Sequence, residues 1–76
     1  MSRGVLSARE LEILLLVARG LSNREIGEKL HLAEATVRGH LANTYSKMDV
    51  SSRAEATRMA LHEDWITASD VTEEIG

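Results

Sequence analysis

Apolar residues recur at helical spacing in four stretches of the chain, and capping residues precede three of them. Each of these three starts has the order Ser-x-x-Glu. In this motif the Ser oxygen accepts a free N–H of the first turn while the Glu side chain reaches back to the cap. The three pairs are Ser7 with Glu10, Ser22 with Glu25, and Ser52 with Glu55. The pattern predicts helices at about 8–19, 23–30, 34–48 and from 53 to 64 or 66.

The link between the predicted second and third helices is very short and consists of His31, Leu32 and Ala33. A link of this kind, with an inward apolar residue in it, is typical of a helix-turn-helix. His31 falls where the backbone must turn left-handed, which His tolerates better than most residues. Gly27 is small enough for the two helices to cross closely. We therefore predict an all-α, four-helix (tetrahelical) helix-turn-helix domain over residues 1–66, followed by an acidic C-terminal tail over residues 67–76.

The predicted third helix has one apolar face and one face of very small residues. At about 100° per residue, the apolar face carries Val37, Leu41, Thr44 and Met48, and the opposite face carries Ala35, Gly39, Ala42 and Ser46. A face exposed to water is normally charged, and Gly inside a helix costs about 1 kcal/mol relative to Ala. The small residues therefore indicate close approach by another molecule. Spacing alone leaves the DNA major groove, a helix of a partner protein, or plain exposure to solvent as alternatives.

In a major groove, the side chains around the small face would divide into base and phosphate contacts. The groove admits one α-helix, Arg donates to guanine O6 and N7, and Ala touches the thymine methyl group. The expected base contacts are therefore Arg38, Ala42 and Ala35, and Gly39 lets the helix backbone sit deep in the groove. The expected phosphate contacts on this helix, which set position without reading sequence, are Lys47, Thr36, His40 and Asn43. Asn23, at the start of the predicted second helix, is also expected to contact phosphate. His40 fits equally well as a packed helix residue.

The predicted fourth helix has two apolar sides, although a small domain has room for one core. The second side is formed, at spacings i, i+3, i+7 and i+11, by Ala54, Thr57, Leu61 and Trp65. We interpret this second side as a homodimer contact. The alternative is that Trp65 folds back over the first helix.

Composition narrows the remaining classes of function. The chain has 76 residues and no Cys, which excludes a disulfide, a zinc–thiolate site and a thiol nucleophile. The three His are not at metal spacing and no catalytic cluster is present. The sequence therefore predicts no metal, no cofactor and no enzymatic activity. No apolar run approaches the roughly 18 residues of a membrane span and no signal-peptide pattern occurs, so the cytoplasm is the expected location.

The charge distribution matters more than the net charge of −3. A negative balance opposes DNA binding on first inspection, because such domains usually carry a basic surface. However, residues 61–76 carry five acidic side chains and no Lys or Arg. The rest of the chain is therefore weakly basic, which permits contact with nucleic acid without demonstrating it.

Several short motifs occur in a characteristic order between Leu6 and Ile66. They are Leu6-Ser-Ala-Arg-Glu10, Leu14, Gly20-Leu-Ser-Asn-Arg-Glu-Ile26, Leu30, Thr36-Val37-Arg38, His40, Asn43, Lys47-Met48, Val50, Ser52-Arg53, Ala56 and Ala60. In these residues the chain resembles the LuxR-type helix-turn-helix domain, the DNA-binding module of many bacterial transcription regulators. Three positions depart from the family pattern: Ala33 replaces the usual Ser or Thr cap of the third helix, Thr44 the usual Ile, and Gly27 the more common Ala.

The resemblance implies that the third helix is the recognition helix, with base contacts at Arg38, Gly39 and Ala42, and that dimers on DNA meet through the fourth helix. We therefore expect a sequence-specific DNA-binding domain of a bacterial transcription regulator. It would bind an inverted repeat as a dimer, with the third helix (about 34–48) in the major groove. The alternative is a degenerate helical protein-interaction module without DNA binding. In the family this domain usually follows a receiver or sensor domain. The chain is thus either a stand-alone regulator or the C-terminal piece of a protein with such an N-terminal partner domain.

Overall fold

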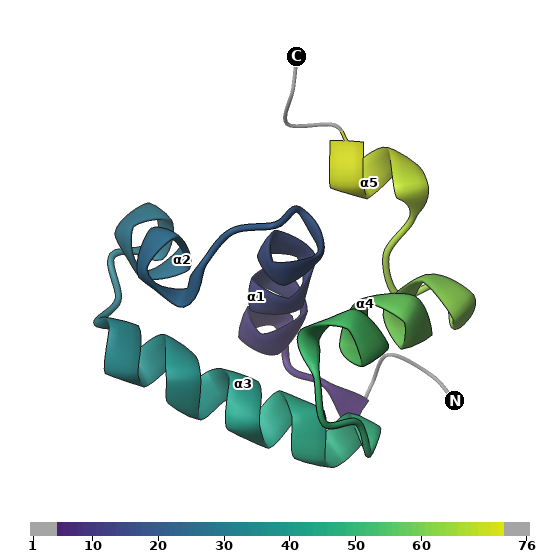
Figure 1. Cartoon of the computed structure of the whole chain (residues 1–76), viewed down its shortest axis with the longest axis horizontal. Helices are drawn as coiled ribbons and strands as arrows, with labels where there is room; N and C mark the ends of the chain where they lie inside the picture. The colour runs from purple at the N-terminus through teal and green to yellow at the C-terminus, as the bar shows by residue number, and fades with distance from the viewer. Residues whose placement is uncertain (1–4, 73–76) are drawn as a thin grey trace.

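The structure, a computed structural model, describes residues 5–72 as α-helices joined by short loops (Figure 1). The helices are α1 (Ala8–Ala18), α2 (Asn23–Leu30), α3 (Glu34–Met48), α4 (Arg53–His62) and α5 (Ala68–Thr72). No strand occurs among these described residues. The predicted all-α fold and its first four helices are confirmed. The count of four is corrected by α5, which lies within the segment expected to be a tail.

Reciprocal capping hydrogen bonds begin α1 and α2, as predicted. Ser7 Oγ accepts from the Glu10 N–H at 3.1 Å, and Glu10 Oε1 accepts from the Ser7 N–H at 2.8 Å. Ser22 and Glu25 form the same pair of bonds at the same two distances. These bonds satisfy backbone N–H groups that have no partner inside the helix.

The starts of α3 and α4 are capped less completely. Ser52 Oγ accepts from the Glu55 N–H at 3.1 Å. The Glu55 carboxylate, however, accepts from the Ser51 N–H at 2.9 Å, so the third predicted capping box is only half formed. Ala33 provides no side-chain cap for α3. The helix expected to recognise DNA therefore begins without one of its usual stabilising bonds, as the departure at Ala33 indicates.

The turn between α2 and α3 has the tight geometry expected from its sequence. His31 adopts the left-handed conformation, with φ 60° and ψ 44°, and the Leu32 N–H donates to the Gly27 carbonyl at 2.8 Å. A Cβ atom placed on Gly27 would lie 2.5 Å from the Leu32 carbonyl oxygen. The absence of a side chain at Gly27 is therefore what allows this turn to close so tightly.

Helix α1 is the centre of the fold, and each of the other four helices contacts it (Figure 1). Ile13 and Leu14, side by side on α1, are fully buried and face different parts of the core. One part, between α1, α2 and α3, consists of Ile13, Leu16, Val17, Ile26, Val37 and Leu41. The other part, beneath α4 and the segment after it, consists of Leu6, Leu14, Met48, Ala56, Ala60, Trp65 and Ile66. Both parts hold α3 against α1, which fixes the direction in which its outer face points.

The segment after α4 packs onto the domain, and this overturns one predicted interface residue. Trp65 is only 5% exposed and lies in the same cluster as Leu14 of α1, so it is part of the core of one chain. The alternative position weighed for Trp65, folded over the first helix, is the one observed. Helix α5 is then held in place by Arg19, whose Nε and Nη2 donate to the Asp70 carbonyl at 3.0 and 2.7 Å, and by packing of Val71 against the core.

Candidate nucleic-acid interface

The outer face of α3 is a row of small, exposed residues. Ala35, Gly39, Ala42 and Ser46, which we call the small-residue ridge, are all exposed. The opposite face of α3 is buried through Val37, Leu41, Thr44 and Met48. A Cβ atom added to Gly39 would meet nothing within 4 Å, so no other part of the described chain covers the middle of the ridge. The apolar face of α3 is thus buried and its small-residue face is exposed, as the periodicity of the sequence predicts.

Thr44 shows how α3 tolerates a polar residue in its buried face. The side chain is fully buried, yet its hydroxyl donates to the His40 carbonyl one turn earlier, at 2.8 Å. The hydroxyl is therefore satisfied within the helix, and the layer that usually contains Ile can close around Thr.

Arg38 stands at one edge of the small-residue ridge with its guanidinium in solvent. Its side chain is 63% exposed, and its Nη1 lies 3.8 Å from Glu34 Oε2, one turn earlier on α3. An exposed ion pair at this separation contributes little to stability. Arg38 can therefore leave Glu34 and turn toward another acceptor at small cost.

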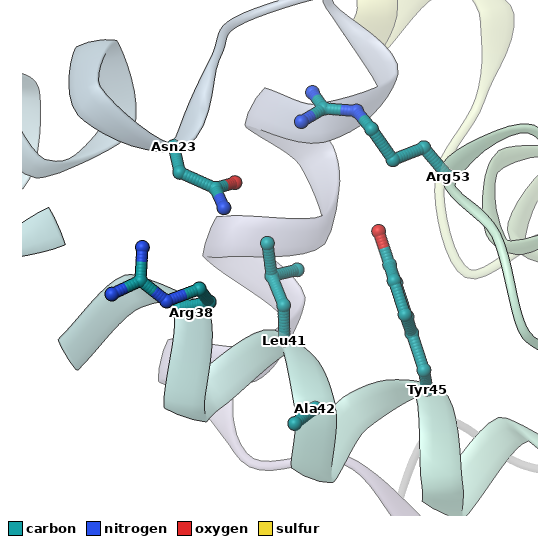
Figure 2. A pocket seen from close by; sticks show the side chains of 6 residues that line it. All are labelled: Asn23, Arg38, Leu41, Ala42, Tyr45 and Arg53. Carbon is teal, nitrogen blue, oxygen red and sulfur yellow. The ribbon is translucent and has the colours of Figure 1, made fainter. Parts of the chain in front are cut away.

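A cavity of about 270 Å³ lies beside the ridge, on the Arg38 edge. Its lining comes from the start of α2, from α3 and from the start of α4, as Figure 2 shows, and consists of Asn23, Arg38, Leu41, Ala42, Tyr45 and Arg53. Arg38 and Ala42 belong to both the ridge edge and the cavity. The fold thus continues the candidate interface from α3 onto the first turns of two other helices.

Two polar atoms in the cavity wall are buried without a hydrogen-bond partner in the described part of the chain, namely Tyr45 Oη and Asn23 Oδ1. Burial raises the pKa of the Tyr45 hydroxyl, and the positive charge of Arg53 opposes this rise only partly. Tyr45 therefore remains a neutral O–H donor near physiological pH. Arg53 itself donates through Nη2 to the Leu21 carbonyl, which ties the start of α4 to the loop before α2.

Tyr45 and Arg53 were not among the predicted site residues. Tyr45 follows Arg38 and Ala42 at i, i+4 and i+7 on one side of α3, so helical spacing contained the signal that could have identified it. Arg53 is distant in sequence, and only its place in the Ser52-Arg53 motif pointed to it.

Lys47, predicted to contact phosphate, is engaged within the domain. Its Nζ donates to Glu10 Oε1 and Oε2 at 2.8 and 3.1 Å, although the Lys47 side chain remains 43% exposed. The Lys47 ammonium and the N–H of Ser7 lower the pKa of the Glu10 carboxyl, against the opposing effect of its burial. A phosphate would have to compete with this ion pair, so the structure assigns Lys47 first to joining the end of α3 to the start of α1.

The other predicted phosphate contacts differ in their exposure. Thr36 and Asn43 are exposed on α3, away from the Arg38 edge, whereas His40 is half-buried. Asn23 is also half-buried, and its amide lines the cavity. The structure therefore brings Asn23 together with Arg38, and it leaves Thr36 and Asn43 on the far side of the ridge.

The part of the chain that forms this interface belongs to a longer stretch that matches a known protein family. Residues 4–60, which include α1, α2, α3 and most of α4, match the family described as bacterial regulatory proteins, luxR family. The chain belongs to the luxR family. The resemblance identified from its motifs, and with it the expectation of a regulator's helix-turn-helix domain, is therefore confirmed.

Individual luxR-family relatives are substantially longer than this chain. The transcriptional regulatory protein LiaR of Bacillus subtilis is 53% identical over 51 residues, which are 67% of this chain and 24% of LiaR. The transcriptional regulatory protein DegU of Brevibacillus brevis is 40% identical over 62 residues, 82% of this chain and 26% of DegU. The response regulator protein VraR of Staphylococcus aureus is 42% identical over 62 residues, 82% of this chain and 30% of VraR. The chain thus spans less than a third of the length of these relatives.

The predicted dimer side of α4 is only partly at the surface. Ala54 and Leu61 are exposed, with Leu61 36% exposed, and Thr57 is half-buried, whereas Trp65 is withdrawn into the core. The luxR-family match ends at residue 60. Leu61, Trp65 and α5 therefore lie outside the matched part of the chain.

Within residues 5–72, no helix combines the length and apolar character that crossing a membrane requires. In the same residues no three His, Asp or Glu side chains are grouped so that they could hold a metal ion.

Proposed function

We propose that this luxR-family chain is a sequence-specific binding domain for double-stranded DNA within a bacterial transcription regulator, and that it acts in the cytoplasm, where bacterial DNA lies. The observation that carries the proposal is the exposed small-residue ridge of α3, with the solvated guanidinium of Arg38 at its edge. A major groove admits one α-helix, and small side chains on the leading face let that helix sit deep. The names of LiaR and DegU as transcriptional regulatory proteins support the same role.

The roles of individual side chains follow from where they stand on α3. Arg38 is proposed to donate to the O6 and N7 of one guanine, and the methyl groups of Ala35 and Ala42 to touch thymine methyls. Gly39 lets the backbone of α3 approach the base edges. Thr36, His40, Asn43 and Asn23 are proposed to contact phosphates, with Lys47 able to join them only by leaving Glu10.

Two copies are proposed to bind an inverted repeat, with their α3 helices in major grooves about 34–36 Å apart. Each domain would extend over residues 1–66, and the subunit contact would use the exposed part of α4. Without Trp65, which is buried within one chain, that contact is reduced to Ala54, Thr57 and Leu61. We further propose a receiver domain as an intramolecular partner, because the relative VraR is named a response regulator protein.

A binding selection from a random oligonucleotide pool tests the proposal directly. Arg38→Ala is expected to weaken binding to the selected site by about 1–3 kcal/mol and to relax the preference at one base pair. Arg9→Ala is the matched control, because Arg9 also forms an exposed intrahelical pair, with Glu12 at 3.3 Å. Arg9 lines neither the ridge nor the cavity. The control is expected to retain the full site preference.

Two results would count against this function. If Arg38→Ala selects the same site with the same preference, Arg38 does not read bases. If the wild-type chain fails to shift random DNA even at low salt, where phosphate contacts are strongest, the chain is a protein-interaction module and the ridge seats a partner helix.

A further inference from the structure

The cavity beside the small-residue ridge contains polar groups that the fold of the chain alone does not satisfy. Tyr45 Oη and Asn23 Oδ1 are both buried and have no hydrogen-bond partner in the described residues. Figure 2 shows the Tyr45 hydroxyl pointing up from α3 toward Arg53, with the amide of Asn23 entering from the start of α2. Native proteins rarely bury a polar group without a partner, because the group loses its hydrogen bonds to water. A ligand that supplied those bonds would remove the defect.

The charge around the cavity selects an anion as that ligand. Two arginines, Arg38 and Arg53, are among its lining residues, and no Asp or Glu is. The cavity also lies at the first turn of α2, where the positive end of the helix dipole favours negative charge. The hydroxyl of Tyr45 can donate to an anion, and a half-turn of the Asn23 amide presents its NH₂ in place of its oxygen.

The position of the cavity selects the source of the anion. Arg38 and Ala42 line both the cavity and the ridge, so a group in the cavity adjoins the proposed base contacts. On DNA, the anion that adjoins the base edges is a backbone phosphate, and phosphate contacts set the register of a protein on the duplex. We propose that this cavity seats one DNA phosphate diester in each half-site, bound by Tyr45, Arg53 and Asn23. The proposal rests on the DNA-binding function proposed above and assigns the phosphate that sets the register of α3.

Tyr45→Phe isolates the hydroxyl and separates binding from stability. A hydroxyl buried without a partner destabilises the free domain, so its removal is expected to raise the Tm by about 4 °C. Loss of one hydrogen bond to a charged group is expected to weaken DNA binding roughly 10-fold, equally for the selected site and for random DNA. A hydroxyl with a purely structural role would change the Tm without this uniform loss of affinity. Ser69→Ala, which removes a hydroxyl on α5 outside the cavity and the ridge, is the control.

The phosphate itself is identified with duplexes in which one phosphate at a time is replaced by an uncharged methylphosphonate. The wild-type protein is expected to lose affinity strongly at one position per half-site, and the Tyr45→Phe variant to be almost insensitive at that same position. Inorganic phosphate at millimolar concentration is expected to leave both the Tm and DNA binding unchanged, because the remaining contacts of α3 are needed to place the anion. A large rise in Tm with inorganic phosphate would overturn the assignment to DNA.

Asn23→Asp is the second variant and does not depend on Tyr45. A carboxylate in the first turn of α2 favours helix formation, so the domain is expected to remain folded, while the added negative charge repels phosphate and lowers affinity for all sequences. If both variants bind DNA as tightly as the wild type, or if the methylphosphonate effect persists unchanged in Tyr45→Phe, the cavity does not seat a phosphate. If the wild type itself binds no DNA, the proposed DNA-binding function is wrong. This result is distinguished from failure of the phosphate site alone, in which the wild type binds DNA and the variants bind it equally well.

Discussion

Substitution of Gly by Ala is expected to have opposite effects on stability at two positions in neighbouring helices. Gly27 lies in α2, where an added Cβ would be 2.5 Å from the Leu32 carbonyl oxygen, well inside the 3.4 Å at which ordinary contact begins. Gly39 lies in α3, where the same Cβ would meet nothing within 4 Å. The two positions therefore separate the intrinsic helix preference of Ala from the space that the fold provides.

The magnitudes follow from these surroundings. Gly39→Ala is expected to stabilise the domain by about 1 kcal/mol, the ordinary difference between Gly and Ala inside a helix. At Gly27 the same gain is offset by overpacking, which usually costs about 1–3 kcal/mol. The clash is with backbone, so no rotamer change relieves it and the left-handed turn at His31 must open. We expect Gly27→Ala to lower the free energy of unfolding by about 1 kcal/mol, although Ala is the more common residue at this position of the family pattern.

Urea unfolding followed by far-UV circular dichroism measures both variants against the wild type. A difference of roughly 2 kcal/mol between them corresponds to about 8 °C or more in Tm for a domain of this size. In the DNA-binding assay, Gly39→Ala should bind less tightly despite its greater stability, because its methyl group stands on the proposed DNA-facing ridge. The reasoning is refuted if Gly27→Ala is as stable as Gly39→Ala, since the turn would then have room for the side chain.

Three further predictions concern two contacts between distant parts of the chain and the proposed contact between two copies of it. Lys47→Met should destabilise the domain by about 1–3 kcal/mol in thermal unfolding, because buried Glu10 loses its ammonium partner. Folding lowers the pKa of Glu10 below its usual 4.5. The ionised Glu10 carboxylate therefore stabilises the domain above about pH 4.5, and this stabilisation is lost as the pH falls through the pKa of Glu10 in the folded state. A Lys47→Met variant whose stability depends on acid pH as that of the wild type does would contradict the role of the Lys47–Glu10 pair. Deletion of residues 68–76 should lower the free energy of unfolding by about 1–3 kcal/mol, because the packing of Val71 and the hydrogen bonds from Arg19 to Asp70 are lost. DNA affinity should not change. An unchanged Tm would show that α5 does not stabilise the domain through α1. Leu61→Glu should weaken binding to an inverted repeat more than binding to a single half-site, whereas Trp65 emission should not shift on dilution because Trp65 is buried in one chain.

Features set by short-range sequence patterns could be predicted, and features set by long-range contacts could not. The capping boxes at Ser7 and Ser22, the left-handed His31 and the two faces of α3 depend on residues a few positions apart, and helical periodicity identifies them. The fold also agrees with the prediction that Thr44 lies inward. Each of these features is a matter of local conformation or of one helix face.

The missed features join residues that are far apart in sequence. Lys47 reaches Glu10 across 37 positions, and Arg19 reaches the Asp70 carbonyl across 51. A helical pattern places Trp65 on the second apolar side of the predicted fourth helix, but it cannot show that α4 ends at His62 and that the segment after it carries Trp65 into the core. The cavity depends on the same kind of information, because Asn23, Tyr45 and Arg53 meet only when three helices are assembled.

Helix α3, the proposed recognition helix, is anchored at both of its ends. The closed turn after Gly27 fixes where α3 begins, and the Lys47–Glu10 pair joins its last turn to α1. A helix held in this way moves with the whole domain and cannot tilt independently to suit different operators. Adaptation at the interface must then come from the DNA, so bendable pyrimidine–purine steps outside the contacted base pairs should be favoured in its binding sites.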